Sequence, residues 1–567
     1  MFIATVPNRK SPPAILLRES YRVAGKVKSR TLANLSKLPS DAIELLRRSL
    51  KGEQLVPVDT FEVLASAHHG HVEAVLLAMR RLGFAQLIGA RPSPQRARVV
   101  AMVAAHLLEP DSKLATTRWW HNTTLPHLLG VSDANEDDLY DALDWLLARQ
   151  HRIERKLAAR HLDNDAMALY DLSSSYFEGV TCPLAAFGHN RDGKKGKLQV
   201  NYGLLTNADG VPIAVSVFKG NTGDPKTLLP QVTTLRERFH LERFVLVGDR
   251  GMITQKQVDA LRDIKGVDWI AALRPEAIRA LLGCGAIQMD LFDERNLFEL
   301  THPDFPGERL VACRNPELAA RRAHKRARLL EATTRELDKV RRMVERGRLK
   351  GRDAIGVRVG KVVNKYRVAK HFTLDIRDHH FDFGIDADKV AAEAALDGLY
   401  VVRTSVAAQR LGSAEAVRSY KRLSQVERAF RSLKSFDLRV RPIYHRLESR
   451  VRAHLFLCLL AYYVQWHMRE AWRPLLFCDE DQEAKATRDP VAPAERSAAA
   501  QRKAQTHTLD DGTPAHSFTT LLKSLSALVR NTCRIPASGC AEHVFHTVTT
   551  PSAQQQRAYE LLRGIKV

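Results

Sequence analysis

The chain has few cysteines, few acidic residues relative to basic ones, and no long hydrophobic run. Its seven cysteines are sparse and odd in number and form no Cys-x-x-Cys pair, so we expect reduced thiols and no cysteine-based metal site. The longest apolar run, Leu455 to Val464, is shorter than the ~20 residues that a membrane-spanning helix needs. The N-terminus lacks a basic start followed by an apolar stretch, so no signal peptide is expected. These absences predict a cytoplasmic protein that has no membrane partner.

The shortage of acidic residues leaves a large positive charge. The 567 residues include 87 Lys and Arg against 64 Asp and Glu, which gives a formal net charge of +23. An excess of this size favours a polyanionic partner, and with a membrane set aside the partner expected is nucleic acid. Hydrophobic residues make up 45% of the chain, enough for packed cores, so general disorder is excluded. At roughly 100–200 residues per domain, the length predicts three to five domains.

Changes in composition and hydrophobic periodicity along the chain predict its domain organisation. We expect a β and linker region at 1–55, a helical DNA-binding domain at 56–165, an α/β core made of 166–275 and 396–475, an insertion domain with a basic helix at 276–395, a polar linker at 476–515, and a helical tail at 516–567. An ordinary helical domain without DNA contacts is an equal reading of residues 56–165.

The α/β core has the most specific pattern. Three apolar strands are followed by an amphipathic helix, a strand, a second helix and another strand, which indicates a mixed sheet. This order matches the first half of a ribonuclease-H-like fold. The fold class expected is therefore multidomain α/β, with a ribonuclease-H-like core split by a large insertion and preceded by a helical region.

Three acidic residues of this core are candidates for chemistry. Asp171 and Asp249 are expected at the ends of the strands ALYD and FVLVGD, and Glu427 lies in a later helix. Carboxylates are the ligands that Mg²⁺ prefers, and three of them can hold two ions about 3.5–4 Å apart for an in-line phosphoryl displacement. A single Asp after a strand is more often a turn residue, so the hypothesis depends on all three together.

Basic and polar residues near these acids are candidates for contacts with DNA. Tyr420 and Lys434 lie seven positions before and after Glu427, which in a continuous helix puts all three on one stripe. The segment RDGKKGK supplies further cations, and the basic helix of residues 316–350 has a cationic face; the candidates there are Lys194, Lys195, Lys197, Arg322 and Arg326. A solvated charged surface is the simpler reading of each.

Two other patterns are set aside. GKKGK lacks the spacing of a phosphate-binding P-loop, so no ATP is implied. The clusters His68-His69-His71 and His379-His380 have no partners at metal-site spacing, and we interpret them as surface histidines.

Five motifs together resemble those of a bacterial insertion-sequence DDE transposase, of the IS-four-like superfamily and of its branch with a long insertion before the glutamate. They are ALYDLSSSYFEG, GHNRDGKKGKLQVNYGLL, SVFKGNTGDPKTL, LVGDRGM and YKRLSQVERAFRSLKS. The resemblance implies that Asp171, Asp249 and Glu427 are the catalytic and metal-binding residues.

The resemblance also brings a helical Tyr–Arg–Glu–Lys signature, matched here by Tyr420, Glu427 and Lys434. The arginine of the signature falls on Leu423. Arg431 lies about 40° from Glu427 on a helical wheel, so we expect Arg431 rather than Arg422 to supply the missing phosphate contact.

The resemblance implies an enzyme that binds the terminal inverted repeats of a mobile element, cleaves them and joins them to target DNA. It further implies two Mg²⁺ ions, with Mn²⁺ as a substitute, double-stranded DNA as partner, a dimer in the DNA complex, and a place at the bacterial nucleoid. Two alternatives stay open: a metal-dependent nuclease that does not join DNA, and a non-catalytic DNA-binding protein such as an inactivated transposase.

Overall fold

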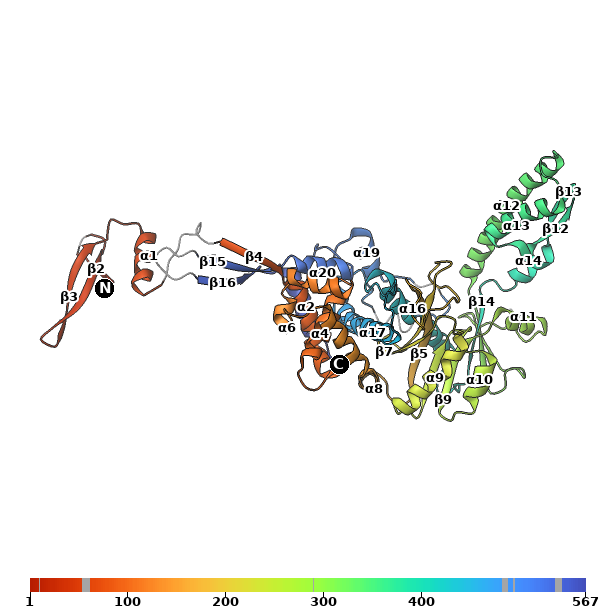
Figure 1. Cartoon of the computed structure of the whole chain (residues 1–567), viewed down its shortest axis with the longest axis horizontal. Helices are drawn as coiled ribbons and strands as arrows, with labels where there is room; N and C mark the ends of the chain where they lie inside the picture. The colour runs from red at the N-terminus through yellow and green to blue at the C-terminus, as the bar shows by residue number, and fades with distance from the viewer. Residues whose placement is uncertain are drawn as a thin grey trace. The chain divides into compact units, whose positions relative to one another are not determined.

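The computed structural model describes residues 1–9, 11–53, 62–288, 290–481, 488–492, 495–535 and 543–566. Its contacts divide the chain into two compact units. The first is Met1–Ala67 with Val529–Thr549, and the second is His68–Leu528 with Thr550–Val567. Figure 1 labels the elements of both.

The described residues of the first unit form two three-stranded sheets and a helix. One sheet has the order β1-β2-β3, from β1 (Phe2–Val6), β2 (Ala14–Val23) and β3 (Lys26–Asn34), and is followed by α1 (Ser40–Leu50). The other has the order β16-β15-β4, from β4 (Glu62–His68), β15 (Val529–Ile535) and β16 (His543–Val548). Two expectations were wrong here: residues 62–68 form a strand rather than helix, and the tail at 516–567 contains two strands.

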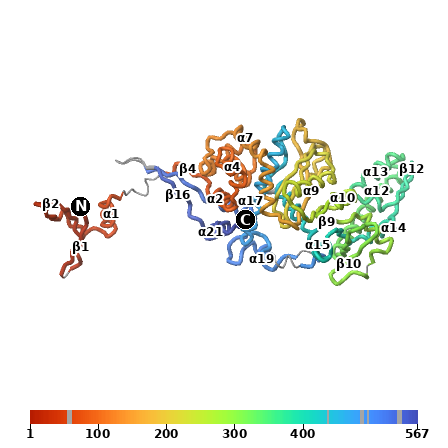
Figure 2. The backbone as a smooth tube through the Cα atoms, turned by 90° about the horizontal axis from the view of Figure 1, so that it is seen from below, coloured from red at the N-terminus to blue at the C-terminus, as the bar shows by residue number. Residues whose placement is uncertain are grey.

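The second unit begins with a helical region. Its helices are α2 (Gly70–Arg81), α3 (Phe84–Ile88), α4 (Pro94–Leu108), α5 (Lys113–Trp119), α6 (Leu125–Leu129), α7 (Glu136–Leu147) and α8 (Gln150–His161). They pack against the long apolar helix α17 (Glu448–Ala471), which contacts α2, α4 and α7 (Figure 2). The apolar run at Leu455–Val464 is thus the buried centre of this region. Among the described residues, no helix has both the length and the apolar character needed to cross a membrane.

An eight-stranded mixed sheet forms the centre of the second unit. Its order is β10-β11-β14-β9-β8-β5-β6-β7. The strands are β5 (Ala166–Tyr176), β6 (Gln199–Asn207), β7 (Pro212–Lys219), β8 (Phe244–Gly248), β9 (Val267–Ala272), β10 (Leu297–Leu300), β11 (Arg309–Arg314) and β14 (Leu399–Thr404). The pairs β5–β8 and β8–β9 are parallel, and the remaining pairs are antiparallel. The mixed sheet expected from the sequence is therefore present.

Helices that follow these strands in sequence pack on the sheet. The helix α15 (Ser413–Lys421) touches β8, β9, β10, β11 and β14, and α16 (Leu423–Arg431) touches β5 and β6. A π-helical turn, η6 (Ser432–Phe436), continues α16. Further helices of this part are α9 (Leu228–Thr233), α10 (Gln255–Arg262), which touches β9, and α11 (Pro275–Gly283), which touches β14.

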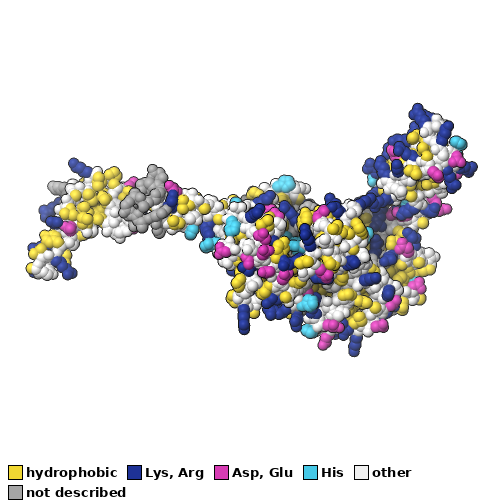
Figure 3. Space-filling model, viewed as in Figure 1, with side chains coloured by type: hydrophobic (Ala, Val, Ile, Leu, Met, Phe, Trp, Pro, Cys, Tyr) yellow, Lys and Arg dark blue, Asp and Glu magenta, His cyan; other side chains and the backbone are white. Residues whose placement is uncertain are grey.

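A small body with its own hydrophobic core interrupts the sheet between β11 and β14. It consists of α12 (Pro316–Glu345), α13 (Arg352–Tyr366), β12 (Phe372–Arg377), β13 (His380–Ile385) and α14 (Ala387–Ala394). Lys and Arg side chains gather on it (Figure 3). The insertion had been expected to start at residue 276, but β10 and β11 pair within the main sheet, so the separate body starts at Pro316.

After α17 come α19 (Ala498–Thr506), α20 (Phe518–Ser526) and α21 (Ala553–Arg563). The linker expected at 476–515 therefore includes one helix, α19; residues 482–487, 493 and 494 of that linker lie outside the described ranges.

Candidate active site

Two of the three candidate acids are brought together by the parallel pair β5–β8. The pairing ends at Tyr170 and Gly248, so Asp171 and Asp249 occupy the next position on each chain. Asp249 directly follows β8, as expected. Asp171 does not lie at the end of its strand, as had been expected, because β5 continues to Tyr176. The pairing of β5 with β8, however, ends one residue before Asp171. Adjacent strands lie about 4.8 Å apart, so the register alone makes the two carboxylates neighbours.

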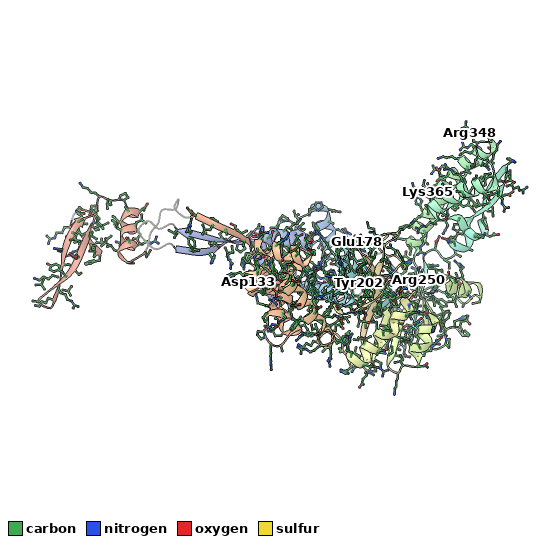
Figure 4. The ribbon with its side chains drawn as sticks, in the orientation of Figure 1. Asp133, Glu178, Tyr202, Arg250, Arg348 and Lys365 are labelled. Carbon is green, nitrogen blue, oxygen red and sulfur yellow. The ribbon has the colours of Figure 1, made fainter. Side chains whose placement is uncertain are left out.

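The third acid reaches the same place from the helix above. α16 contacts β5 and β6 through a buried apolar side made of Val426, Ala429 and Phe430. Glu427 is exposed beside this side. Its charge and that of Asp249 act both on Asp171 and on Tyr420. Figure 4 labels Arg250, the residue that follows Asp249. The three acids, which come from separate elements, therefore lie close enough to interact electrostatically.

The pKa of Asp171 reflects these neighbours. It is raised to about 7, chiefly by burial; the carboxylates of Asp249 and Glu427 also raise it, whereas the Leu172 backbone N–H and Arg191 lower it. The Leu172 N–H donates to Asp171 Oδ1 at 2.7 Å, and the Arg250 N–H donates to Asp249 Oδ1 at 2.7 Å. Two like charges thus act on Asp171, and a cation bound among the three would relieve this repulsion.

The donor set fits a hard divalent cation, which is bound by carboxylate oxygens. Among the described residues, no three His, Cys, Asp or Glu side chains already lie in a ligand arrangement. The fit therefore depends on the chemistry of the three acids and on their mutual electrostatic effect at Asp171.

Tyr420 joins the cluster from α15. Burial raises the pKa of its hydroxyl above the ordinary value, and the charges of Asp249 and Glu427 add to that shift, while Arg250 opposes it. A half-buried neutral hydroxyl thus lies beside the acids, in line with the predicted stripe.

Lys434 departs from that stripe. A π-helical turn, whose hydrogen bonds join residues five apart, follows Arg431. The seven-residue spacing from Glu427 to Lys434 therefore does not return to the same face. Lys434 Nζ instead donates to Asp192 Oδ1 at 2.9 Å, and its side chain is only 10% exposed.

Asp192 is the centre of a buried ion-pair cluster. Its side chain is 2% exposed and accepts hydrogen bonds from Lys434, from Arg441 and from the Tyr176 backbone N–H at the end of β5. This carboxylate ties together the strand of Asp171, the turn after α16 and the loop at Arg441.

The other basic candidates divide into exposed and paired residues. Lys197 donates to Glu178 Oε2 at 2.8 Å, and Arg326 forms a bidentate pair with Asp397 in which both side chains are about one-tenth exposed. The exposed candidates are Lys194, Lys195, Arg322 and Arg431. The loop that contains Lys194 and Lys195 begins directly after the Asp192 cluster.

Arg191 is a residue near the site that the sequence reading left out. Its guanidinium donates to Asp224, it lowers the pKa of Asp171, and its Nη1 is buried with no hydrogen-bond partner among the described residues. Its position directly before Asp192 in the motif GHNRDGKKGK was the available signal.

The histidine interpretation was partly wrong. His379 and His380 are exposed as expected, but His71 is 8% exposed, and burial lowers its pKa to about 4.

Comparisons with known proteins show the family to which the chain belongs. A family model described as "Transposase DDE domain" matches residues 179–464, half of the chain; it includes Asp249 and Glu427 and begins just after Asp171. A model described as the N-terminal domain of IS1634 family transposases matches residues 3–56. No curated protein matches. Among solved structures, the chain is similar to a cryo-EM structure of piggyBac transposase in a synaptic complex with hairpin DNA, at 8% identity and a TM-score of 0.32, over 83% of this chain and 88% of that one.

Proposed function

Because the chain belongs to the transposase DDE family and is therefore a DNA transposase, we propose that Asp171, Asp249 and Glu427 are its catalytic residues. The observation that carries the proposal is the end of the β5–β8 pairing, which makes Asp171 and Asp249 neighbours beneath Glu427. The reaction proposed is cleavage at the ends of a mobile element, followed by joining of those ends to target DNA.

We propose a ribonuclease-H-like core for this chemistry. In the order β7-β6-β5-β8-β9 the first three strands are antiparallel and the next two parallel, which supports that assignment. The core would comprise residues 166–315 and 396–475, with the body of α12–α14 as its insertion.

Divalent metal ions are general in this family, and Asp171, Asp249 and Glu427 would hold them, two Mg²⁺ ions with Mn²⁺ as a substitute. Such ions, when bound, stabilise the charge that develops on the reacting phosphate and activate the attacking oxygen. The protein's own contribution is positioning. The Tyr420 hydroxyl orients Asp249, and the exposed Arg431 holds a phosphate of the strand being cut.

Further DNA contacts are proposed for the exposed cations Lys194, Lys195 and Arg322. Lys197, Arg326 and Lys434 are held by carboxylates, so we assign them to positioning those segments rather than to direct contact. The helical region at 68–165 is a second candidate DNA-binding part. Since two element ends have to meet before joining, we expect a dimer on DNA.

The test is cleavage of a linear DNA that carries an element end, with Mg²⁺ present. Asp171→Asn, Asp249→Asn and Glu427→Gln should each reduce cleavage to the level of a reaction without protein, while circular dichroism stays unchanged. Glu276→Gln, which removes an exposed acid of α11, should cleave normally. Normal cleavage by any one of the three variants would exclude that residue from catalysis.

Joining separates a transposase from a nuclease. Given pre-cleaved ends and a target plasmid, the wild-type protein should produce joined products, and none of the three variants should. Cleavage without joined products would favour the nuclease.

A further inference from the structure

A cavity of about 670 Å³ lies in the second unit, away from the three acids. Its walls come from α4, α5, α7, α17 and the loop of residues 439–447. Five of its lining side chains are Lys or Arg and one is acidic, Asp111. A cavity whose charged lining is mainly cationic favours an anion.

Lys113 is the buried cation of this cavity. Its side chain lines the cavity, is 5% exposed, and makes no ion pair or hydrogen bond within the described residues. Burial lowers its pKa, and the only group that raises it is the Cys458 thiol. A buried ammonium without a carboxylate is costly unless an anion completes its surroundings.

The other four cations that line the cavity differ in whether a carboxylate pairs with them. Arg439, Arg441 and Arg450 are paired with carboxylates, at 3.8 Å from Glu109 for Arg439 and 2.8 Å from Asp144 for Arg450, and with Asp192 for Arg441. Arg446 is exposed and forms no ion pair with a carboxylate among the described residues. Lys113 and Arg446 therefore supply the charge that the cavity leaves uncompensated.

Three histidines form part of the wall without adding charge. Burial lowers the pKa of His106 to about 3 and that of His445 to about 4, and it lowers the pKa of His454 well below its ordinary value. His106 and His454 are hydrogen-bonded to the backbone of Leu438 and Val440. They hold the start of the 439–447 loop, so the cavity has a fixed polar wall around Lys113.

Two aromatic rings complete the lining. Tyr140 is covered by the Arg450 guanidinium at 4.6 Å from its ring centre, and Tyr444 is 67% exposed. Rings beside cations suit a ligand that carries both a phosphate and a flat base, more than they suit a small carboxylate.

We propose that this cavity is a phosphate-binding site that takes a phosphate group of a DNA strand, with Lys113 as its buried counter-ion and Arg446 as its exposed one. The DNA origin of the phosphate rests on the proposed function; the phosphate site itself rests on the cavity. Arg441 links the two places, because it lines the cavity and donates to Asp192, the carboxylate that also holds Lys434 beyond Glu427.

The test is calorimetric binding to the full chain at fixed ionic strength, without metal ions. The probes are inorganic phosphate, thymidine monophosphate, a thymidine hexanucleotide and, as a carboxylate control, succinate. We expect one site for a phosphate-bearing probe, weakened at least tenfold by Lys113→Met and severalfold by Arg446→Gln. Lys365→Met, which removes an exposed lysine of α13, should bind like the wild type.

The outcomes are separable. If only the hexanucleotide binds, and both substitutions weaken it, the site takes the phosphate of a DNA strand. If inorganic phosphate also binds, and both substitutions weaken that binding too, the site accepts free phosphate as well. No phosphate binding, equal binding by all variants, or equally tight succinate binding would overturn the proposal. Arg446→Gln keeps the test valid if Lys113→Met does not fold, since Arg446 is exposed. The readout is binding, so its failure leaves the cleavage test of the three acids independent.

Discussion

Asp192 illustrates how one carboxylate organises the surroundings of the catalytic acids. It is 2% exposed and accepts from two cations and one backbone N–H, so its hydrogen-bonding capacity is well used. Because Lys434 and Arg441 come from either side of residues 435–440, their shared acceptor fixes that turn against the end of β5.

We expect Asp192→Asn to destabilise the protein by about 3–5 kcal/mol, the usual cost of leaving buried charges without their partner. Glu178→Gln removes the acid of the exposed pair with Lys197 and should cost less than about 1 kcal/mol. Urea unfolding followed by tryptophan fluorescence measures both. Equal losses would mean that the cluster is not held as described.

Arg431 is expected to contact a DNA phosphate. Arg431 is exposed, whereas Arg422 lies 3.7 Å from Glu415. Arg431→Ala should therefore weaken binding of element-end DNA more than Arg422→Ala does, by several fold at low salt, because a phosphate contact is lost. Fluorescence anisotropy with a labelled end fragment measures this, and the reverse order would contradict the assignment.

The residues of the site were predictable to different degrees. Asp249 and Glu427 stand in motifs whose strand or helix is clear from the sequence, and Asp171 was placed correctly except for the length of its strand. Lys434 was not predictable from spacing, because wheel geometry assumes a continuous α-helix and the π-helical turn breaks that assumption. Lys113 lies in no recognisable sequence motif. Its place in the wall of a cavity becomes apparent only in the folded structure.

Among the elements, β6 depends on a glycine that lies close to an aromatic ring. A Cβ added at Gly203 would lie 2.1 Å from the Tyr170 hydroxyl and 2.6 Å from its ring. Tyr170 is the last residue of β5 paired with β8, directly before Asp171.

We expect Gly203→Ala to cost at least about 1–3 kcal/mol through overpacking and to reduce cleavage by displacing Asp171. The matched control is Gly223→Ala, since Gly223 has φ −73° and no atom within 4 Å of an added Cβ. Thermal unfolding and the cleavage assay check both variants. A fully stable and active Gly203→Ala protein would show that β6 can move to accommodate the methyl group without displacing Asp171.

The elements that the sequence predicted best are those with local signals. The strands of the central sheet and the buried helix α17 follow from apolar periodicity. The strand β4 and its partners β15 and β16 were missed, because their pairing joins distant segments and leaves most of β4 exposed, without a clear alternation. The boundary of the insertion was misplaced because β10 and β11 have only 4 and 6 residues and join the sheet at its edge.

At the scale of the molecule, burial strongly lowers the pKa of six histidines described in the second unit: His71, His106, His161, His445, His454 and His467. Each has a folded pKa below its ordinary value of 6.5, so the unfolded chain binds more protons below pH 6.5. Their contribution to stability is thus present above pH 6.5 and is lost as the pH falls toward 4. Glu154 and Asp171 have the opposite sign: the pKa of each is raised to about 7, chiefly by burial, so their contribution is lost as the pH rises toward 7.

With six histidines against two acids, we expect the free energy of unfolding to fall on acidification from pH 6.5 to 4. Each histidine accounts for up to about 1.4 kcal/mol per pH unit. His467→Gln should make this dependence shallower by up to one proton, whereas His379→Gln, at an exposed position, should leave it unchanged. Urea unfolding at several pH values measures the slopes. A slope that is flat or reversed in the wild type would contradict the buried, neutral state.

The sheet β16-β15-β4 cannot form until translation of the chain is almost complete. Ser66 of β4 donates to Asn531 of β15, 465 positions later. A ribosome adding about 5–20 residues per second makes that stretch in roughly 20–90 s, and throughout this time the edge of β4 has no β15 to pair with. Unpaired strand edges bind other strands. A nascent chain would therefore expose this edge until residues 529–548 emerge, so translation speed sets the earliest moment at which the first unit is complete.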